Sequence, residues 1–298
     1  MKEFNNIIKK IGEELGIKVT LLSGDWVTIL EKNNQIHYIH GYKFDLNNHG
    51  IGNLLDDKGL FNDLMNYKKL PTTTQLSIFR TYNKEEVLAY FKRNNNTLIV
   101  KGNLGTCGEN VYLVHDENTL FNKIDLLLLK QDSISLEPYY DIQNEYRVIL
   151  LDNEVKVIYG KERPVIIGDG IHTVKELAIN FNDFFANNNK SINNLDYIPK
   201  LNEKVELDFH FNLSLGARLF YDIDENLKNR IINLAKEVSC ALNITFASID
   251  IIHTSDDKIL VLEANSGVMM DNFIKQYPNG YNIAYNIYRD AIKLMFKI

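Results

Sequence analysis

The chain has 298 residues, of which 45% are hydrophobic and 24% charged, and its formal net charge is −6. This composition is typical of a globular protein with room for a core divided over two or three lobes. The negative charge and the lack of a basic run exclude an obvious nucleic-acid partner. The longest aliphatic run, Leu126–Leu129, is too short to cross a membrane, and the charged N-terminal segment predicts no secretory signal. Two cysteines give neither a disulfide framework nor a metal-ligand spacing, so we expect a cytoplasmic protein.

The predicted elements alternate between helices and short strands. Apolar residues at helical spacing predict an amphipathic helix over residues 2–15, followed by strands at 26–31 and 35–40 around an Asn33-Asn34 turn. The later elements expected are a helix over 53–67, a strand after Thr72, a helix over 83–93, strands at 97–101 and 111–114, a helix over 117–130, a hairpin of 144–151 and 154–162, helices after Gly170 and over 224–242, a hairpin of 246–253 and 258–265, and a helix over 281–296. This mixture indicates an α+β fold with several antiparallel hairpins.

The last predicted hairpin contains the side chains that indicate a function most clearly. If its turn is centred between Asp256 and Asp257, Asp250 lies directly opposite Glu263, and Asn265 shares their face. Opposed residues have Cβ atoms roughly 4.5–5.5 Å apart, so two carboxylates there call for a cation, and oxygen ligands suit Mg²⁺. A three-residue turn would instead place the carboxylates on opposite faces of an ordinary solvated strand pair. The face expected to be buried consists of Ala247, Ile249 and Ile251 against Leu260, Leu262 and Ala264.

A glycine-rich segment follows the predicted strand at 97–101. Lys101, Gly105 and Gly108 are of the residue types that approach phosphate oxygens, because glycine frees the backbone N–H groups and lysine adds charge. Walker A and dinucleotide loops lead into a helix, whereas this one leads into the strand at 111–114. A flap over a triphosphate is the functional interpretation, and an irregular hairpin turn is the alternative. Protein kinases have such a flap, but their His-Arg-Asp and Asp-Phe-Gly motifs are missing here.

Together these segments resemble, in order, the motifs of the ATP-grasp superfamily, specifically its carboxylate–amine ligases of the cyanophycin synthetase, glutathione synthetase and ribosomal glutamate ligase kind. The resemblance covers most of residues 53–298. The matching segments are Asp57-Lys58 with Leu70-Pro71-Thr72, Ile99-Val-Lys101 with the glycine loop, Glu137-Pro-Tyr-Tyr140, Glu145-Tyr-Arg147, Arg163-Pro164 with Gly168-Asp-Gly-Ile-His-Thr173, His210-Phe-Asn-Leu-Ser-Leu-Gly-Ala217, and Asp250 with Leu262-Glu-Ala-Asn265. Phe211 departs from the pattern because it separates His210 from Asn212.

The resemblance implies an ATP-grasp fold, in which a nucleotide lies between two antiparallel sheets. Residues 1–70 would form a small N-terminal lobe, residues 71–135 a nucleotide-covering lobe, and residues 136–298 a large lobe with the adenine hinge and the metal hairpin. The implied reaction joins a carboxylate to an amine through an acyl phosphate, forming an amide or peptide bond and releasing ADP and phosphate. The implied cofactors are ATP and one or two Mg²⁺ ions, with Mn²⁺ as an alternative. The implied substrates are small molecules, such as an amino acid or short peptide, and a homodimer would fit.

The resemblance also implies a role for individual residues. The groups expected to bind ATP are Lys58 and Lys101 at the α- and β-phosphates, the loop of Gly105, Thr106, Cys107 and Gly108 over the β- and γ-phosphates, Glu137, Pro138 and Tyr139 at adenine, and Glu145, or else Asp141, at the ribose. The expected Mg²⁺ ligands are Asp250, Glu263 and Asn265. Cys107 is expected to be a small side chain rather than a nucleophile, because no histidine lies beside it in the sequence.

The expected catalytic residues are three arginines and one asparagine. Arg163 would stabilise the transferring phosphoryl group, since a guanidinium can hold two of its oxygens at once. Arg147 and Arg218 would bind substrate carboxylates, although Arg147 could equally form a structural ion pair with Glu145. Asn212 would bind metal or substrate, or else complete a turn.

Two other functions remain open for the sequence alone. One is a regulatory ATP-binding module without catalysis, which would keep the hinge and lysines but lose a metal carboxylate or the phosphoryl-stabilising arginine. The other is an ATP-grasp kinase that phosphorylates a hydroxyl group. Residues 1–70 carry no motif to which we can assign chemistry.

Overall fold

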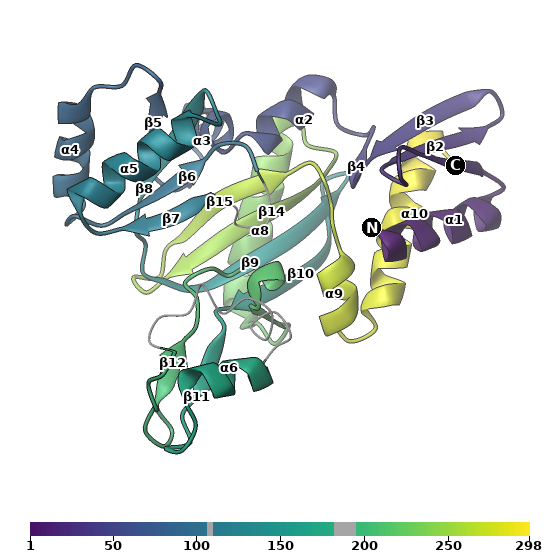
Figure 1. Ribbon diagram of the computed structural model, residues 1–298. Helices are drawn as coiled ribbons and strands as arrows, with labels where there is room; N and C mark the ends of the chain where they lie inside the picture. The colour runs from purple at the N-terminus through teal and green to yellow at the C-terminus, as the bar shows by residue number, and fades with distance from the viewer. Residues whose placement is uncertain (106–109, 182–194) are drawn as a thin grey trace.

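Three antiparallel sheets of four or five strands, with a further two-stranded sheet, organise the chain in a computed structural model that describes residues 1–105, 110–181 and 195–298 (Figure 1). The helices are α1 (Lys2–Leu15), α2 (His49–Asp56), α3 (Lys58–Tyr67), α4 (Lys84–Arg93), α5 (Glu117–Leu128), α6 (Val174–Phe181), α8 (Glu225–Leu242), α9 (Asp271–Gln276) and α10 (Gly280–Phe296), with a 3₁₀ segment η2 (Leu213–Leu215). The strands are β1 (Lys18–Leu22), β2 (Val27–Lys32), β3 (Gln35–His40), β4 (Lys43–Phe44), β5 (Leu76–Phe79), β6 (Leu98–Gly102), β7 (Val111–Val114), β8 (Ser133–Pro138), β9 (Ile142–Leu151), β10 (Glu154–Glu162), β11 (Val165–Ile167), β12 (Lys204–Glu206), β13 (Arg218–Phe220), β14 (Phe246–Thr254) and β15 (Ile259–Asn265). The predicted α+β class is confirmed.

The five-stranded sheet, in the order β13-β10-β9-β14-β15, lies at the centre of the molecule. Helix α8 covers one face, where Leu234 and Val238 share a core with Ile249 and Ile251 of β14 (Figure 1). Alternate residues of the same strands point to the other face, as the period of two along a strand requires. Ser248, Asp250 and Ile252 of β14 therefore line a cavity on that side.

The β14–β15 hairpin has the predicted pairing of Asp250 with Glu263, but its turn differs from the predicted one. The backbone N–H of Thr254 donates to the Lys258 carbonyl, so the turn has three residues rather than a centre between Asp256 and Asp257. A regular ladder from such a turn would separate Asp250 from Glu263. The register shifts by one residue after Asp250, and this β-bulge restores the pairing of Asp250 with Glu263.

The bulge also changes which residues of β15 reach the core. Val261 is fully buried opposite Ile251, and Ala264 is buried opposite Ile249. Leu262 is the extra residue, and its side chain lines the cavity instead. The prediction that Leu260 and Leu262 share the buried face was therefore wrong, because it assumed an uninterrupted alternation. Ala247, Ile249, Ile251 and Ala264 were placed correctly.

A second sheet, in the order β5-β8-β6-β7, forms the small lobe that carries the glycine-rich segment. Helices α4 and α5 pack on one face of this sheet, where Phe91 and Ile124 join Leu98, Val100 and Leu136 in a separate core. The other face looks toward the central sheet, so the space between the two sheets is bounded by antiparallel strands on both sides (Figure 1). This arrangement positions the predicted nucleotide site.

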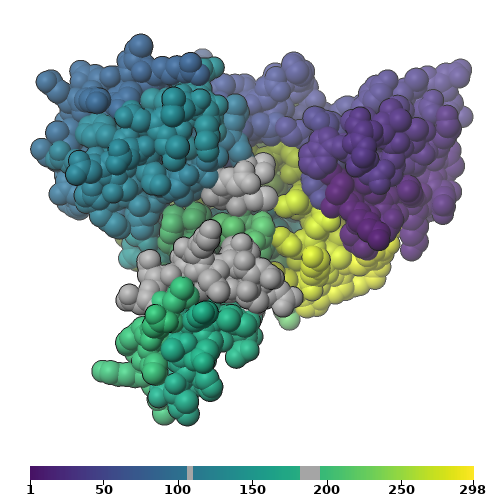
Figure 2. Space-filling view, viewed as in Figure 1, coloured from purple at the N-terminus to yellow at the C-terminus, as the bar shows by residue number. Residues whose placement is uncertain are grey.

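The third sheet, β1 to β4, packs with the helices from both ends of the described chain. The apolar stripe of α1 predicted from the sequence, including Phe4 and Ile8, is buried against Tyr288 and Ile292 of α10. Figure 2 shows this purple N-terminal region and the teal small lobe standing apart, with yellow and green residues visible between them. The N-terminal region therefore forms a wall facing the small lobe.

Some elements differ from their predicted form. The helix expected over 53–67 is two helices, because Asp57 ends α2 and its carboxylate caps α3 by accepting from the Leu60 backbone N–H. Strands β1, β4, β8, β11, β12 and β13 and helix α9 were not predicted, and the lobe boundaries near residues 70 and 135 stay predictions. Within the described ranges, no helix has both the length and the hydropathy needed to cross a membrane.

We expect Ile251→Ala to destabilise the protein by about 2–5 kcal/mol, because it leaves a void in the core between α8 and the central sheet. The matched control is Ile36→Ala, since the Ile36 side chain is 51% exposed on β3 whereas Ile251 is fully buried. Ile36→Ala should change stability by less than about 0.5 kcal/mol. Urea unfolding followed by circular dichroism compares the two, and equal midpoints would contradict the core assignment.

Candidate functional site

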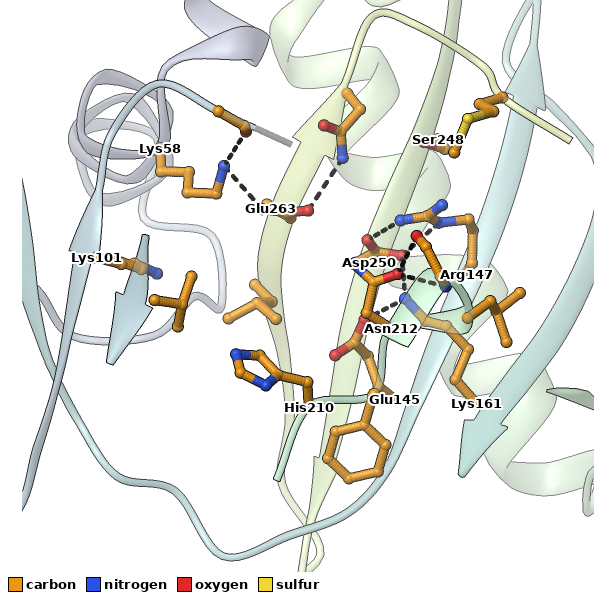
Figure 3. Close-up of a pocket in the computed structure, with 18 of the residues that line it drawn as sticks. Lys58, Lys101, Glu145, Arg147, Lys161, His210, Asn212, Ser248, Asp250 and Glu263 are labelled. Atoms are coloured by element: carbon orange, nitrogen blue, oxygen red, sulfur yellow. Dashed lines mark hydrogen bonds and ion pairs between the residues drawn. The ribbon is translucent and has the colours of Figure 1, made fainter. Parts of the chain in front are cut away.

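One cavity of about 890 Å³ is bounded by all three large sheets. The predicted site residues that line it are Lys58, Lys101, Gly105, Glu137, Pro138, Tyr139, Glu145, Arg147, Arg163, Asn212, Asp250, Glu263 and Asn265. Figure 3 shows Lys58 and Lys101 on one side of this cavity, with Glu145, Arg147, Lys161 and Asp250 on the other and Glu263 between them. Segments far apart in the chain therefore converge, as the order of the motifs predicted.

Of the other four predicted residues, only Arg218 belongs to the described ranges. Thr106, Cys107 and Gly108 are outside the described residues. Arg218 does not line the cavity, and its guanidinium lies over the ring of Phe181, 3.9 Å from the centroid. Its predicted contact with a substrate carboxylate stays a prediction.

The small-lobe end of the cavity is an apolar slot with one buried ion pair. Ile99, Val111 and Ile142 line it, and Lys101 and Glu137 form an ion pair at its wall. The two charged side chains are 6% and 5% exposed, and the second carboxylate oxygen of Glu137 has no partner among the described residues. A buried acceptor without a partner is costly, so this oxygen is ready for a ligand N–H group.

Lys58 connects the start of α3 to the β14–β15 hairpin. Its ammonium donates to the Gly105 carbonyl oxygen at 3.0 Å and lies 3.4 Å from a carboxylate oxygen of Glu263 (Figure 3). Glu263 also accepts from the Asn265 amide at 3.2 Å. Burial raises the pKa of Glu263, but the Lys58 ammonium, the Arg147 guanidinium and the Asn265 amide together hold that pKa below its ordinary value. Glu263 is therefore an ionised carboxylate at neutral pH.

Asp250 is held by two cations. The Arg147 guanidinium donates to both of its carboxylate oxygens, at 2.8 and 2.5 Å, and the Lys161 ammonium lies 3.2 Å from one of them (Figure 3). Burial raises the pKa of Asp250, but Arg147 and Lys161 together hold it well below its usual range. The ion-pair alternative for Arg147 is therefore present, with Asp250 rather than Glu145 as the partner.

Glu145 is the second acid of this buried group, and its side chain also contacts Lys161. Burial raises the pKa of Glu145 to about 7, with the Lys161 ammonium opposing that shift. We predicted Glu145 as the acceptor of ribose hydroxyls, whereas in the structure its carboxylate forms an ion pair with Lys161. The predicted alternative, Asp141, is exposed.

Lys161 is the residue that our sequence analysis missed. It lies near the end of β10, and Arg163 follows one residue after that strand ends. Its side chain is only 4% exposed. The available signal was a lysine directly after the apolar Val157–Gly160 stretch, since a lysine buried in a strand requires acidic partners.

Arg163 lines the same cavity, and its polar contacts there are long. Its guanidinium is 3.3 Å from Glu206, 3.3 Å from the Tyr139 hydroxyl and 4.7 Å from the centroid of the Phe211 ring. The Nε group is buried and has no partner within the part of the chain that the structure describes. Phe211, which departs from the expected motif, thus supports the arginine predicted to act on the phosphoryl group.

The residues on either side of Phe211 have separate roles. Asn212 caps η2 by accepting from the backbone and hydroxyl of Ser214, so the turn alternative is present. His210 contacts Asp208 through Nδ1 at 2.5 Å, and its Nε2 is buried without a partner among the described residues. Figure 3 shows the His210 ring turned into the cavity. Its free nitrogen can therefore meet a ligand.

The N-terminal region closes the far end of the cavity. Trp26, Tyr42 and Lys43 line it from one side, and Phe273 of α9 lines it from the other. The Trp26 indole donates to His40 at 3.0 Å, which fixes the two rings together. We predicted no chemistry for residues 1–70, because these side chains acquire a shared surface only after the sheets pack.

The hairpin residues fit a Mg²⁺ ion by their chemistry. Asp250 and Glu263 are direct partners across two strands, and Asn265 follows on the same strand, so two carboxylates and an amide border the cavity together. Such oxygen ligands suit Mg²⁺, which completes its shell with waters and phosphate oxygens. No cluster of three or more His, Cys, Asp or Glu residues offers an all-protein metal site in the described ranges.

Comparison with known proteins identifies the fold. No protein-family model and no curated protein matches the chain. Among solved structures, it is similar to a bifunctional glutathione synthetase from Pasteurella multocida (17% identity, TM-score 0.56, covering 96% of this chain and 43% of that one). It is also similar to D-alanine–D-alanine ligase from Bacillus anthracis complexed with ATP (14%, 0.52, 82% and 68%) and to the ATP-grasp ligase PsnB (14%, 0.50, 82% and 63%). The predicted ATP-grasp fold is confirmed, and the chain spans less than half the length of the glutathione synthetase.

We expect Arg147→Met and Asp250→Asn each to destabilise the protein by about 3 kcal/mol, because each leaves a buried charge without its partner. The double variant should lose less than the sum of the two, since both partners are then removed. Urea unfolding of the four proteins measures this coupling. The matched control is the exposed pair Arg230 and Asp257, whose side chains are 36% and 72% exposed and whose coupling should stay below about 1 kcal/mol. Equal coupling in the two pairs would contradict the buried assignment.

Proposed function

We propose that this protein of the ATP-grasp fold is an ATP-dependent carboxylate–amine ligase that works through an acyl phosphate. The observation that carries the proposal is the convergence in one cavity of an apolar slot, two lysines, the opposed acids Asp250 and Glu263, and Arg163. Each of these features suits one part of the reaction. The solved ligases of the same fold support the reaction class.

The chemistry requires two steps at one place. A carboxylate oxygen attacks the γ-phosphorus of ATP, ADP leaves, and an acyl phosphate forms. The nitrogen of an amine then attacks the acyl carbon, the amine loses a proton, and inorganic phosphate leaves. Negative charge gathers on the phosphoryl oxygens and then on the tetrahedral oxygen, so the protein acts mainly by positioning groups and stabilising charge.

ATP would lie with adenine in the slot between the small and central sheets. Ile99, Val111 and Ile142 would cover the two faces of the base, and the backbone of residues 137–139 would meet its edge. The unpartnered oxygen of Glu137 would accept a hydrogen bond from the amino group of adenine. Glu145 remains our candidate for the ribose, where it would have to share its carboxylate with Lys161.

The triphosphate would then run toward the metal hairpin. Lys101 and Lys58 would contact the α- and β-phosphates, and the loop that includes Gly105 would lie over the β- and γ-phosphates. Mg²⁺ bound at Asp250, Glu263 and Asn265 would supply charge neutralisation at the phosphates. Lys58 already contacts both the loop and Glu263, so it is placed to join the nucleotide to the metal side.

The acyl phosphate would form beside Arg163. Its contacts to Glu206 and Tyr139 are long, so the guanidinium can turn to phosphoryl oxygens with little loss. Arg147 and Asn212 remain proposed substrate contacts, although each also has a structural partner in Asp250 or Ser214. The amine would enter from the end lined by Trp26 and Phe273. We propose an amino acid or short peptide as substrate.

Hydroxylamine trapping tests the proposed function. The protein is incubated with Mg-ATP, hydroxylamine and a panel of amino acids supplied one at a time. For the correct acid we expect a hydroxamate, with equal amounts of ADP and phosphate, because hydroxylamine intercepts only an acyl phosphate. A phosphorylated hydroxyl compound without hydroxamate would identify a kinase. ATP binding without any ADP across the panel would identify a non-catalytic module.

We expect Glu263→Gln and Lys101→Ala each to lower ADP formation at least ~100-fold, because each removes a charge that would hold the triphosphate. Both variants should keep the far-ultraviolet circular dichroism of the unsubstituted protein. Glu154→Gln is the control, since Glu154 is 73% exposed and contacts only Lys156 outside the cavity. Full activity in either cavity variant would remove the phosphate and metal assignments.

A further inference from the structure

The first turn of α3 is attached to the small-lobe sheet by one buried asparagine. Asn103 follows β6 directly, and its backbone carbonyl oxygen accepts a hydrogen bond from the Lys58 backbone N–H at 3.1 Å. The N–H groups at the start of a helix have no partner within the helix, so this carbonyl satisfies one of them. Asn103 therefore connects the small lobe to one of the two lysines proposed to hold the phosphates.

The Asn103 side chain is itself fixed by two serines of β8. Its amide nitrogen donates to the Ser133 hydroxyl oxygen at 3.0 Å, and its amide oxygen accepts from the Ser135 hydroxyl at 2.6 Å. Asn103 is 3% exposed and Ser135 is fully buried, so breaking these hydrogen bonds would leave buried polar groups without partners. The two bonds therefore hold the side chain in one orientation.

Gly59, the second residue of α3, lies directly against this side chain. A Cβ atom at position 59 would be 2.5 Å from Nδ2 of Asn103 and 3.1 Å from its Cγ, which is closer than a Cβ atom tolerates. The amide cannot move away without breaking its hydrogen bonds to Ser133 and Ser135. The close approach of α3 to the small lobe therefore requires glycine at position 59.

This contact fixes the backbone from which the Lys58 side chain extends. The Lys58 ammonium donates to the Gly105 carbonyl oxygen at 3.0 Å and lies 3.4 Å from Glu263 (Figure 3). A lysine has a flexible four-carbon stem, so the place of its ammonium depends on where its backbone is held. Neither Asn103 nor Gly59 is among the described residues that line the cavity. Their effect on a nucleotide is therefore exerted through Lys58.

We propose that Asn103 and Gly59 are positioning residues for the nucleotide, because they fix the start of α3 so that the Lys58 ammonium meets the phosphates. The inference rests on the proposed function, which assigns the α- and β-phosphates to Lys58 and Lys101. It adds that the contact between α3 and the small lobe sets the affinity for the triphosphate. Without this contact, Lys58 keeps its charge but loses its fixed place.

Calorimetric titration tests the proposal without turnover. The ligand is a Mg²⁺-loaded ATP analogue whose β- and γ-phosphorus atoms are joined by nitrogen. We expect Asn103→Ala to weaken binding about tenfold, which is the typical effect of losing one hydrogen bond to a charged group. In a Lys58→Ala background the same substitution should change the affinity less than about twofold, because the lysine that Asn103 positions is then absent. An equal loss in both backgrounds would overturn the proposal, since Asn103 would then act independently of Lys58.

Asn47→Ala is the matched control. The Asn47 amide also holds backbone groups, because it accepts from the N–H groups of Thr245 and Phe246 and donates to the Phe246 carbonyl oxygen. Asn47 is not among the described residues that line the cavity. We expect this variant to lower the midpoint of thermal unfolding, as Asn103→Ala does, but to change the affinity less than about twofold. A loss of affinity equal to that of Asn103→Ala would show that lower stability alone weakens binding, and would overturn the proposal.

Gly59→Ala keeps the test decisive if Asn103→Ala does not fold. The added methyl group would displace the Asn103 amide, so we expect binding about tenfold weaker when Lys58 is present. In the Lys58→Ala background, Gly59→Ala should change the affinity less than about twofold. Unchanged affinity in folded Gly59→Ala would overturn the proposal, because the close approach would then have no effect on the nucleotide.

The same titrations separate this inference from the proposed function. If the unsubstituted protein does not bind the analogue, both are overturned. If it binds the analogue and Lys58→Ala does not weaken binding, the phosphate contact of Lys58 and this inference are overturned together. If Lys58→Ala weakens binding but neither Asn103→Ala nor Gly59→Ala does, only this inference is overturned and the ligase assignment stands.

Discussion

Charge compensation on the inner face of the central sheet is the constraint on which the site depends. Asp250, Glu145, Arg147 and Lys161 are buried there together, and each would be costly alone. Their mutual contacts allow the opposite face of the same strands to pack tightly on α8. The sheet therefore separates an apolar core from a charged cavity floor, with one strand supplying both sides.

The pairing of Asp250 with Glu263 shows which features of the site the sequence pattern can predict. Alternation and the motif order placed the two acids opposite each other, and the structure agrees. The three-residue turn and the compensating bulge at Leu262 were not readable, because a bulge leaves no residue signature as strong as glycine or proline. Two departures from the assumed geometry cancelled, so a correct pairing followed from an incorrect turn.

The parts of the site that escaped prediction depend on tertiary contacts. The role of Lys161 can be recognised only once β9, β10 and β14 lie side by side. Their pairing brings Glu145 and Asp250 next to its ammonium group. Trp26 and Phe273 line the same cavity although they are 247 positions apart in the sequence. Local motifs predicted several of the segments that line the cavity, since a loop, a hinge and a hairpin each carry their own pattern. The end of the cavity bounded by the N-terminal region carries none.

The packing of α1 on α10 bears on the order in which the molecule can assemble. The Glu14 carboxylate accepts a hydrogen bond from the Tyr285 hydroxyl, 271 positions further along the chain. The apolar stripe of α1 has no complete covering until α10 is available. A ribosome must therefore synthesise nearly every other element before this core can close, and contacts of such sequence separation are slow to form. Until then the stripe is an exposed apolar surface to which chaperones or unrelated chains can bind.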